Sequence, residues 1–114
     1  MTPEQVSALS DVELNRAMIW LYPPEGKHWM DPDTGTHYMF DEYDLYQIHM
    51  LDDYNLTMPL VIEEKIQINT KPYTKDTWKA YRSIGSRSFS ASNKRYLRAA
   101  CECLVLIAMS KANG

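Results

Sequence analysis

The feature that most constrains this chain is the segment 93–111, which has its longest helical pattern and its most apolar run. Several residues recur at spacings of three and four, the period of one helix face: Leu97, Ala100, Cys101, Leu104, Ala108 and Lys111. Between Ala99 and Met109 only Glu102 is charged, and Val105 and Ile107 extend the apolar character to the other faces. A helix that is apolar nearly all round is buried on more than one side. Its apolar run is about eleven residues, whereas a bilayer takes roughly twenty, so the rest of the chain must cover it.

Length and composition predict an ordinary globular domain. The chain has 114 residues, of which 45% are hydrophobic and 24% charged, and this length suits one domain with one modest core. No charged-then-apolar leader opens the chain, so we expect a cytoplasmic protein. Cys101 and Cys103 lie two positions apart on the predicted helix and point in different directions, so they form neither a disulfide within it nor a metal site. We interpret both as small buried hydrophobes.

The charges are divided unevenly along the chain. Residues 1–70 contain thirteen acidic residues against three lysines and arginines, a net charge of −10. Residues 71–114 contain two acidic residues against nine lysines and arginines, a net charge of +7. This polarity predicts either that the two halves face each other or that they face different partners.

Capping signals place the helices of the first half. Thr2 to Gln5 and Ser10 to Glu13 both have the pattern of a helix N-terminus, so a short helix or turn is followed by a longer helix. The longer helix is predicted to run from Asp11 to about Trp20 and to end before the Pro23-Pro24 pair.

The middle of the chain reads as a hairpin followed by a loop. The segments 27–30 and 36–40 flank the turn formers Asp31-Pro32-Asp33-Thr34-Gly35 and predict a β-hairpin. Residues 41–53 fit neither period and predict a loop with an extended piece near residues 46–50.

A third helix is predicted to run to about Lys65. Its cap is Asp52 or Asp53, or else Thr57, because Pro59 is compatible only with a first turn. The segments 66–69 and 77–84 alternate like half-buried strands, and the serine-rich residues 86–92 lead into the last helix. The order α-β-β-α-β-β-α predicts an α+β fold in a single domain of residues 1–114. We expect a mainly antiparallel sheet of about four strands, covered by helices, with the C-terminal helix buried.

Short motifs along nearly the whole chain resemble phage proteins of the NinX-like, ABA-sandwich type. Three of these motifs occur in the same order in that family: Leu9-Ser10-Asp11-x-Glu13-Leu14-Asn15, Asp52-Asp53-Tyr54-Asn55-Leu56-x-Met58-Pro59-Leu60-x-x-Glu63 and Leu97-Arg98-Ala99-Ala100. Two more lie where the family has similar residues: Trp29-x-Asp31-Pro32-Asp33 and Trp78-x-Ala80. The resemblance implies a phage or prophage origin and a sheet packed against helices. It implies little about chemistry, because these are small accessory proteins, and the aromatic stretch 38–46 departs from the family pattern.

The sequence contains no convincing pattern of catalytic or metal-binding residues. A hairpin would bring His28 close to His37, and acidic residues lie nearby, but the histidines have no metal-ligand spacing. The serines of residues 86–92 have no histidine near them in sequence. We therefore predict a protein that is not an enzyme and that has no metal and no cofactor.

The basic second half is one candidate binding surface. Tyr73, Trp78 and Tyr81 interleave with lysines there, as a surface for single strands or nucleotides requires. Helix N-terminal amides together with arginine and serine side chains would hold a phosphate. The predicted phosphate or nucleotide site consists of Lys79, Arg82, Arg87, Ser90, Ser92 and Arg95. The alternative is a solvated strand and loop that carry lysines.

The acidic, tyrosine-rich middle of the chain is the other candidate surface. Tyrosine is favoured at interface hot spots, and spaced carboxylates attract a basic partner. The predicted partner-binding residues are Tyr38, Asp41, Glu42, Tyr43, Asp44, Tyr46, Asp53 and Tyr54. The alternative is that these tyrosines belong to the core.

From these patterns we predict a phage accessory protein that acts by binding a host protein, as an inhibitor of a host factor or defence system. The acidic middle is the preferred surface, and binding of nucleic acid or a nucleotide by the basic half is the alternative. No membrane association is expected. A homodimer is favoured if Val105 and Met109 form an exposed apolar stripe.

Overall fold

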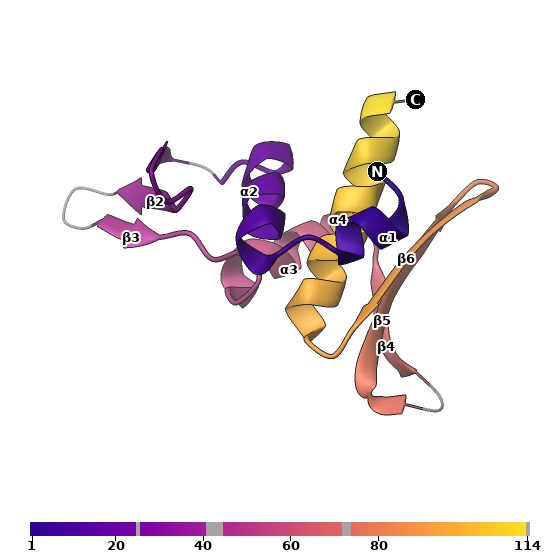
Figure 1. Ribbon diagram of the computed structural model, residues 1–114. Helices are drawn as coiled ribbons and strands as arrows, with labels where there is room; N and C mark the ends of the chain where they lie inside the picture. The colour runs from indigo at the N-terminus through magenta and orange to yellow at the C-terminus, as the bar shows by residue number, and fades with distance from the viewer. Residues whose placement is uncertain (25, 41–44, 72–73, 114) are drawn as a thin grey trace.

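The structure, a computed structural model, describes residues 1–24, 26–40, 45–71 and 74–113. Its elements in chain order are α1 (Pro3–Ser7), α2 (Asp11–Leu21), β1 (Lys27–Met30), β2 (His37–Phe40), β3 (Leu45–Gln47), α3 (Tyr54–Glu63), β4 (Gln67–Lys71), β5 (Thr74–Ile84), β6 (Arg87–Asn93) and α4 (Tyr96–Asn113). The fold is α+β, as predicted. Figure 1 shows the helices between two separate sheets, one on each side of the molecule.

The helix starts follow the predicted capping signals. Thr2 and Ser10 each form a complete capping box, with Gln5 and Glu13 respectively. Asp53 caps α3, so the helix begins at the second of the three candidate caps. Pro59 therefore lies inside α3 and not in its first turn.

The first sheet, sheet A, contains β1, β2 and β3 in that order. The predicted hairpin is present, with Trp29 opposite Tyr38 and Met30 opposite His37. Its turn ends at Gly35, which has a φ of 72° that favours glycine. The extended piece expected near residues 46–50 instead begins at Leu45 and forms β3, which pairs antiparallel with β2.

The second sheet, sheet B, contains β4, β5 and β6 in that order, all antiparallel. The serine-rich segment that was expected to be a linker is the strand β6. It is stable as a strand because Phe89 and Ala91 pack against the core, whereas Ser88 and Ser90, which alternate with them, are exposed. The described residues thus form two sheets of three strands where we expected a single sheet of about four.

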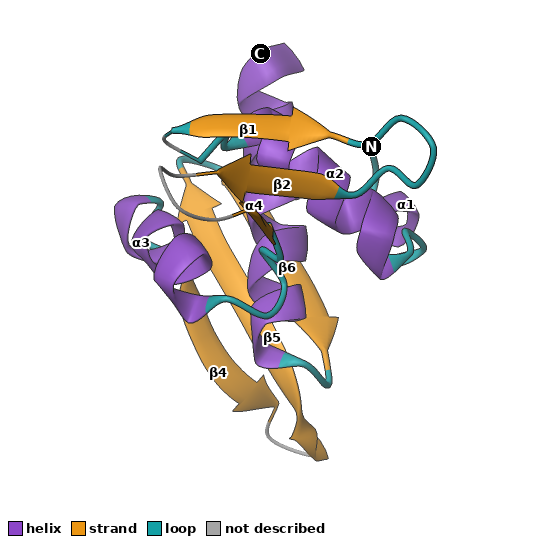
Figure 2. Ribbon diagram, turned by 90° about the vertical axis from the view of Figure 1, so that its left-hand side faces the viewer, coloured by secondary structure: helices purple, strands orange, loops and turns teal. Residues whose placement is uncertain are grey.

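Helix α4 is buried, as its all-round apolar pattern predicted. It contacts α1, α2, α3 and sheet B, which together cover its different faces (Figure 2). Its buried residues include Leu97, Ala99, Ala100, Cys101, Cys103, Leu104, Val105, Leu106 and Ile107. Because its own chain buries Val105, that residue gives no reason to expect a symmetric partner on this face of α4.

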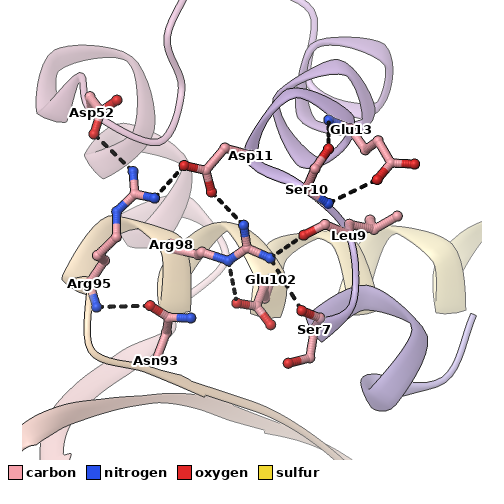
Figure 3. Close-up of polar contacts among 10 residues, drawn as sticks. All are labelled: Ser7, Leu9, Ser10, Asp11, Glu13, Asp52, Asn93, Arg95, Arg98 and Glu102. Carbon is pink, nitrogen blue, oxygen red and sulfur yellow. Dashed lines mark hydrogen bonds and ion pairs between the residues drawn. The ribbon is translucent and has the colours of Figure 1, made fainter.

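A network around two arginines of α4 joins the acidic and basic halves of the chain (Figure 3). Arg98 donates to Glu102 at 3.1 Å, to the Leu9 carbonyl at 2.6 Å and to a carboxylate oxygen of Asp11. Arg95 donates to Asp11 and, at 3.1 Å, to Asp52. The hydrogen bond from Arg95 lowers the pKa of Asp11 below its usual value. The two halves therefore face each other here, the first of the two arrangements that the charge pattern predicted.

None of the helices in the described part of the chain has both the length and the apolarity needed to cross a bilayer.

Candidate functional site

The predicted acidic surface is only partly within the described residues. Asp41, Glu42, Tyr43 and Asp44 lie outside them, and so does the side chain of Tyr46. Tyr38 is half-buried in β2, where its ring stacks on Trp29 with 5.7 Å between centroids. At the start of α3, Asp53 caps the helix and the exposed Tyr54 stacks on Tyr96. The described members of the set thus lie on different elements with different neighbours.

The predicted phosphate site is also divided. Lys79, Ser90 and Ser92 share the outer face of sheet B, with Lys79 directly opposite Ser92. Arg82 and Arg87 alternate onto the other face, and Arg82 forms an ion pair with Glu64 at 3.0 Å. Arg95 is held by Asp11 and Asp52 in the network of Figure 3. The structure does not bring these residues together as one anion site.

A different surface stands out between α2 and sheet A. Trp20 of α2 is 85% exposed, and Trp29, Met30 and Phe40 of sheet A are 48%, 42% and 40% exposed. A groove with a volume of about 600 Å³ lies between these elements. We call it the tryptophan groove; it is lined by Arg16, Ile19, Trp20, Pro23, His28, Trp29, Met30 and His37.

The local sequence accounts for this arrangement. In α2 the residues Leu14 and Met18 are buried, and Trp20 lies off their face, so its indole projects to solvent. The helix ends at Leu21 before the two prolines, and the chain then turns into β1. In β1 the alternation of side chains puts His28 and Met30 on one face and Lys27 and Trp29 on the other.

The polar part of the groove is cationic. The guanidinium of Arg16 lies so close to Gly35 that a Cβ built on this glycine would be 2.0 Å from Nη2. Burial lowers the pKa of His37, and the nearby Arg16 and His28 lower it further. His37 is therefore neutral at pH 7, and its Nδ1 is buried without a hydrogen-bond partner among the described residues. An apolar groove with a guanidinium at its side suits an apolar ligand that carries an anionic group.

Replacing Arg16 with glutamine is expected to raise the pKa of His37 toward its usual value, because removal of a nearby cation makes protonation easier. An NMR titration of the histidine ring protons measures this shift. The control is Arg87→Gln, which removes an exposed arginine from the hairpin of sheet B. An unchanged pKa of His37 in Arg16→Gln would show that Arg16 does not act on the groove.

The remaining candidate groups are two histidines of sheet A and two cysteines of α4. His28 and His37 lie on the same face of the hairpin, as expected, but the described residues contain no metal-binding group of three or more histidines, cysteines or carboxylates. Cys101 and Cys103 are buried on α4, and burial raises the pKa of each thiol to about 12. Both thiols are therefore protonated at neutral pH and behave as the small buried hydrophobes that we inferred.

Sequence reasoning missed the tryptophan groove. Trp20 was noted only as the end of a helix, and Trp29 only as part of a family motif. The available signal was a tryptophan outside the periodic apolar face of α2, followed across a proline break by Trp29 and Met30. Periodicity identified the buried residues, and these exposed ones were the exceptions to it.

The comparisons with known proteins do not assign this site. No family model matches the chain, and no match was found among curated proteins. The resemblance to phage NinX-like proteins remains a prediction.

Proposed function

We propose that this protein acts by binding another protein, which it holds in the tryptophan groove. Following the resemblance, we propose that it is a phage accessory protein that inhibits a host factor or defence protein inside the host cell. The observation that carries the binding proposal is the clustering of exposed Trp20, Trp29 and Met30 around one groove. Tyr38 of the predicted tyrosine-rich segment does not line the groove, but its ring stacks on the groove residue Trp29.

Exposing large apolar side chains to water is unfavourable in free energy, so a cluster of them on the surface indicates an interaction site. Burying apolar surface contributes roughly 25 cal/mol per Å², and large exposed apolar patches mark interaction sites. Tryptophan is enriched among residues that dominate binding energies. A volume of about 600 Å³ also lies within the range of about 300–1,000 Å³ that is typical of ligand sites.

The lining of the groove suggests the chemistry of the bound segment. Its apolar walls fit a bulky apolar side chain of the partner. Arg16 forms no ion pair with another described residue, so a carboxylate beside that side chain would pair with it. We therefore propose a partner segment in which an aromatic or large aliphatic residue is flanked by an acidic one.

Replacing Trp20 or Trp29 with alanine is expected to weaken partner binding by about 2 kcal/mol or more, the range of an interface hot spot. The full-length chain and its variants are used to capture proteins from bacterial host lysate, and captured proteins are quantified by mass spectrometry. The purified partner is then titrated by calorimetry.

The control is Ile62→Ala, because Ile62 is 71% exposed on α3 and does not line the groove. A partner retained by Ile62→Ala and lost by both tryptophan variants would support the proposal. Equal retention by all the variants would contradict it.

A further inference from the structure

The strand β1 forms an open edge of sheet A. In Figure 2 it lies at the outer border of the sheet, next to β2, and all four of its residues are exposed. Among the described residues no other strand pairs with this edge. Native proteins usually protect such an edge, because its free backbone groups are a template for another strand.

The hydrogen-bond register shows which backbone groups face outward. Asp31 N donates to Thr36 O at 2.9 Å, and the paired residues of an antiparallel ladder alternate between hydrogen-bonded and non-hydrogen-bonded. Trp29 with Tyr38 is therefore the next bonded pair, whereas His28 and Met30 point their N–H and C=O groups away from β2. The hydrogen bond from Ile48 N to His37 O at 2.9 Å supports this assignment. His37 lies opposite Met30, and its backbone carbonyl points to β3 and not to β1.

We infer that the occupant of this edge is a second copy of this chain, paired through β1 across a two-fold axis. In this arrangement His28 of each copy pairs with Met30 of the other copy, and Trp29 lies opposite its own equivalent. Each His28–Met30 pair exchanges two backbone hydrogen bonds. The two sheets then continue into one sheet across the dimer.

The residues on either side of β1 determine the register in which the two copies pair. A shift that pairs Met30 with its equivalent would place His28 opposite Pro32, which has no N–H to donate. The opposite shift, which pairs His28 with its equivalent, would place Met30 opposite Gly26. That residue precedes the strand and has a φ of 108°, outside the extended region. Only the register centred on Trp29 lets both outward-facing residues of each copy, His28 and Met30, form backbone hydrogen bonds with the other copy.

This register also makes the charges complementary. Lys27 of one copy lies directly opposite Asp31 of the other, and the same pair recurs at the other end of the interface. These are non-hydrogen-bonded positions of the new ladder, where side chains are closest and opposite charges stabilise the pairing. Lys27 and Asp31 form no ion pair with described residues of their own chain, so both are available.

The dimer would extend the aromatic surface of sheet A. Trp29 already stacks on Tyr38, and the two-fold axis places the tryptophan of the second copy beside it. The same face would then carry a row of four aromatic rings. This inference does not rest on the proposed function, although His28, Trp29 and Met30 also line the tryptophan groove. The dimer is measured on the chain without a partner, so either proposal can fail while the other holds.

Charge variants of the full chain test the pairing. Lys27→Asp puts two carboxylates opposite each other, and Asp31→Lys puts two ammonium groups opposite each other, so each variant alone should stay monomeric. An equimolar mixture restores both opposite-charge pairs and should dimerise. Native mass spectrometry and sedimentation equilibrium, from low to several hundred micromolar protein, distinguish the 13.3 kDa monomer from a species of twice that mass.

The wild-type chain and the control Lys79→Asp, on the outer face of sheet B, should dimerise equally. Recovery in the mixture cannot come from unfolded variants, so it supports the interface even though Asp31 also accepts a turn hydrogen bond from Asp33 N. A monomeric wild-type chain at the highest concentration would overturn the inference. So would dimers of Lys27→Asp alone, or a mixture that stays monomeric.

Discussion

Replacing Arg98 with leucine is expected to lower the free energy of unfolding by about 3–5 kcal/mol, the cost of removing one partner of a buried ion pair. Arg98 and Glu102 are both buried on α4, and Arg98 also donates to the carbonyls of Ser7 and Leu9 (Figure 3). The variant would leave the Glu102 carboxylate buried without its cation and would release the contacts to α1 and the residues that follow it. Chemical denaturation at pH 7 measures the loss.

The loss should shrink as the pH falls. Burial already raises the pKa of Glu102 above its usual 4.5, and Arg98 opposes this rise. Without Arg98 the folded pKa rises further, so the folded variant binds a proton more tightly than the unfolded one and gains stability as the pH falls toward 4.5. A difference between variant and wild type that is the same at pH 7.5 and pH 5.5 would contradict this account.

A double variant separates the buried charge from the lost contacts. Arg98→Leu with Glu102→Leu removes both charges, and replacing a buried pair by apolar residues is often close to neutral. The double variant should therefore be more stable than Arg98→Leu alone at pH 7. If it is less stable than Arg98→Leu, the unpaired Glu102 is not the source of the loss.

Replacing Leu104 with alanine is expected to cost about 2–5 kcal/mol, because it leaves a cavity at a fully buried position in the middle of α4. The Leu104 carbonyl accepts a hydrogen bond from the Tyr22 hydroxyl at 3.1 Å. Because this carbonyl belongs to the backbone, the hydrogen bond is kept in the variant. The measured loss therefore reports side-chain packing. Denaturant titration gives the value, and exposed Ile62→Ala serves as the control with an expected change near zero. A loss below about 1 kcal/mol for Leu104→Ala would mean that this face of α4 is not in the core.

The sequence alone determined the features that depend on short-range patterns. The capping boxes at Thr2 and Ser10 specify helix starts because cap and partner are only three residues apart. The apolar run of α4 required burial on several sides, whatever covered it. The turn formers before Gly35 specified the hairpin of β1 and β2. From these features came the α+β class and the buried C-terminal helix.

Only the tertiary structure decided the features that depend on contacts between distant residues. The segment that forms β6 has a serine at every second position. It is a strand because Phe89 and Ala91 pack against the core and β5 supplies the backbone hydrogen bonds. Arg95 was assigned to the predicted phosphate site, yet both Arg95 and Arg98 bind Asp11, which is more than eighty positions away in the chain. The tryptophan groove has the same origin, since Trp20 of α2 and Met30 of β1 line one groove only in the folded chain. Local propensity and periodicity are read within a few residues, whereas ion pairs, strand partners and grooves are set by which distant surfaces the buried core brings together.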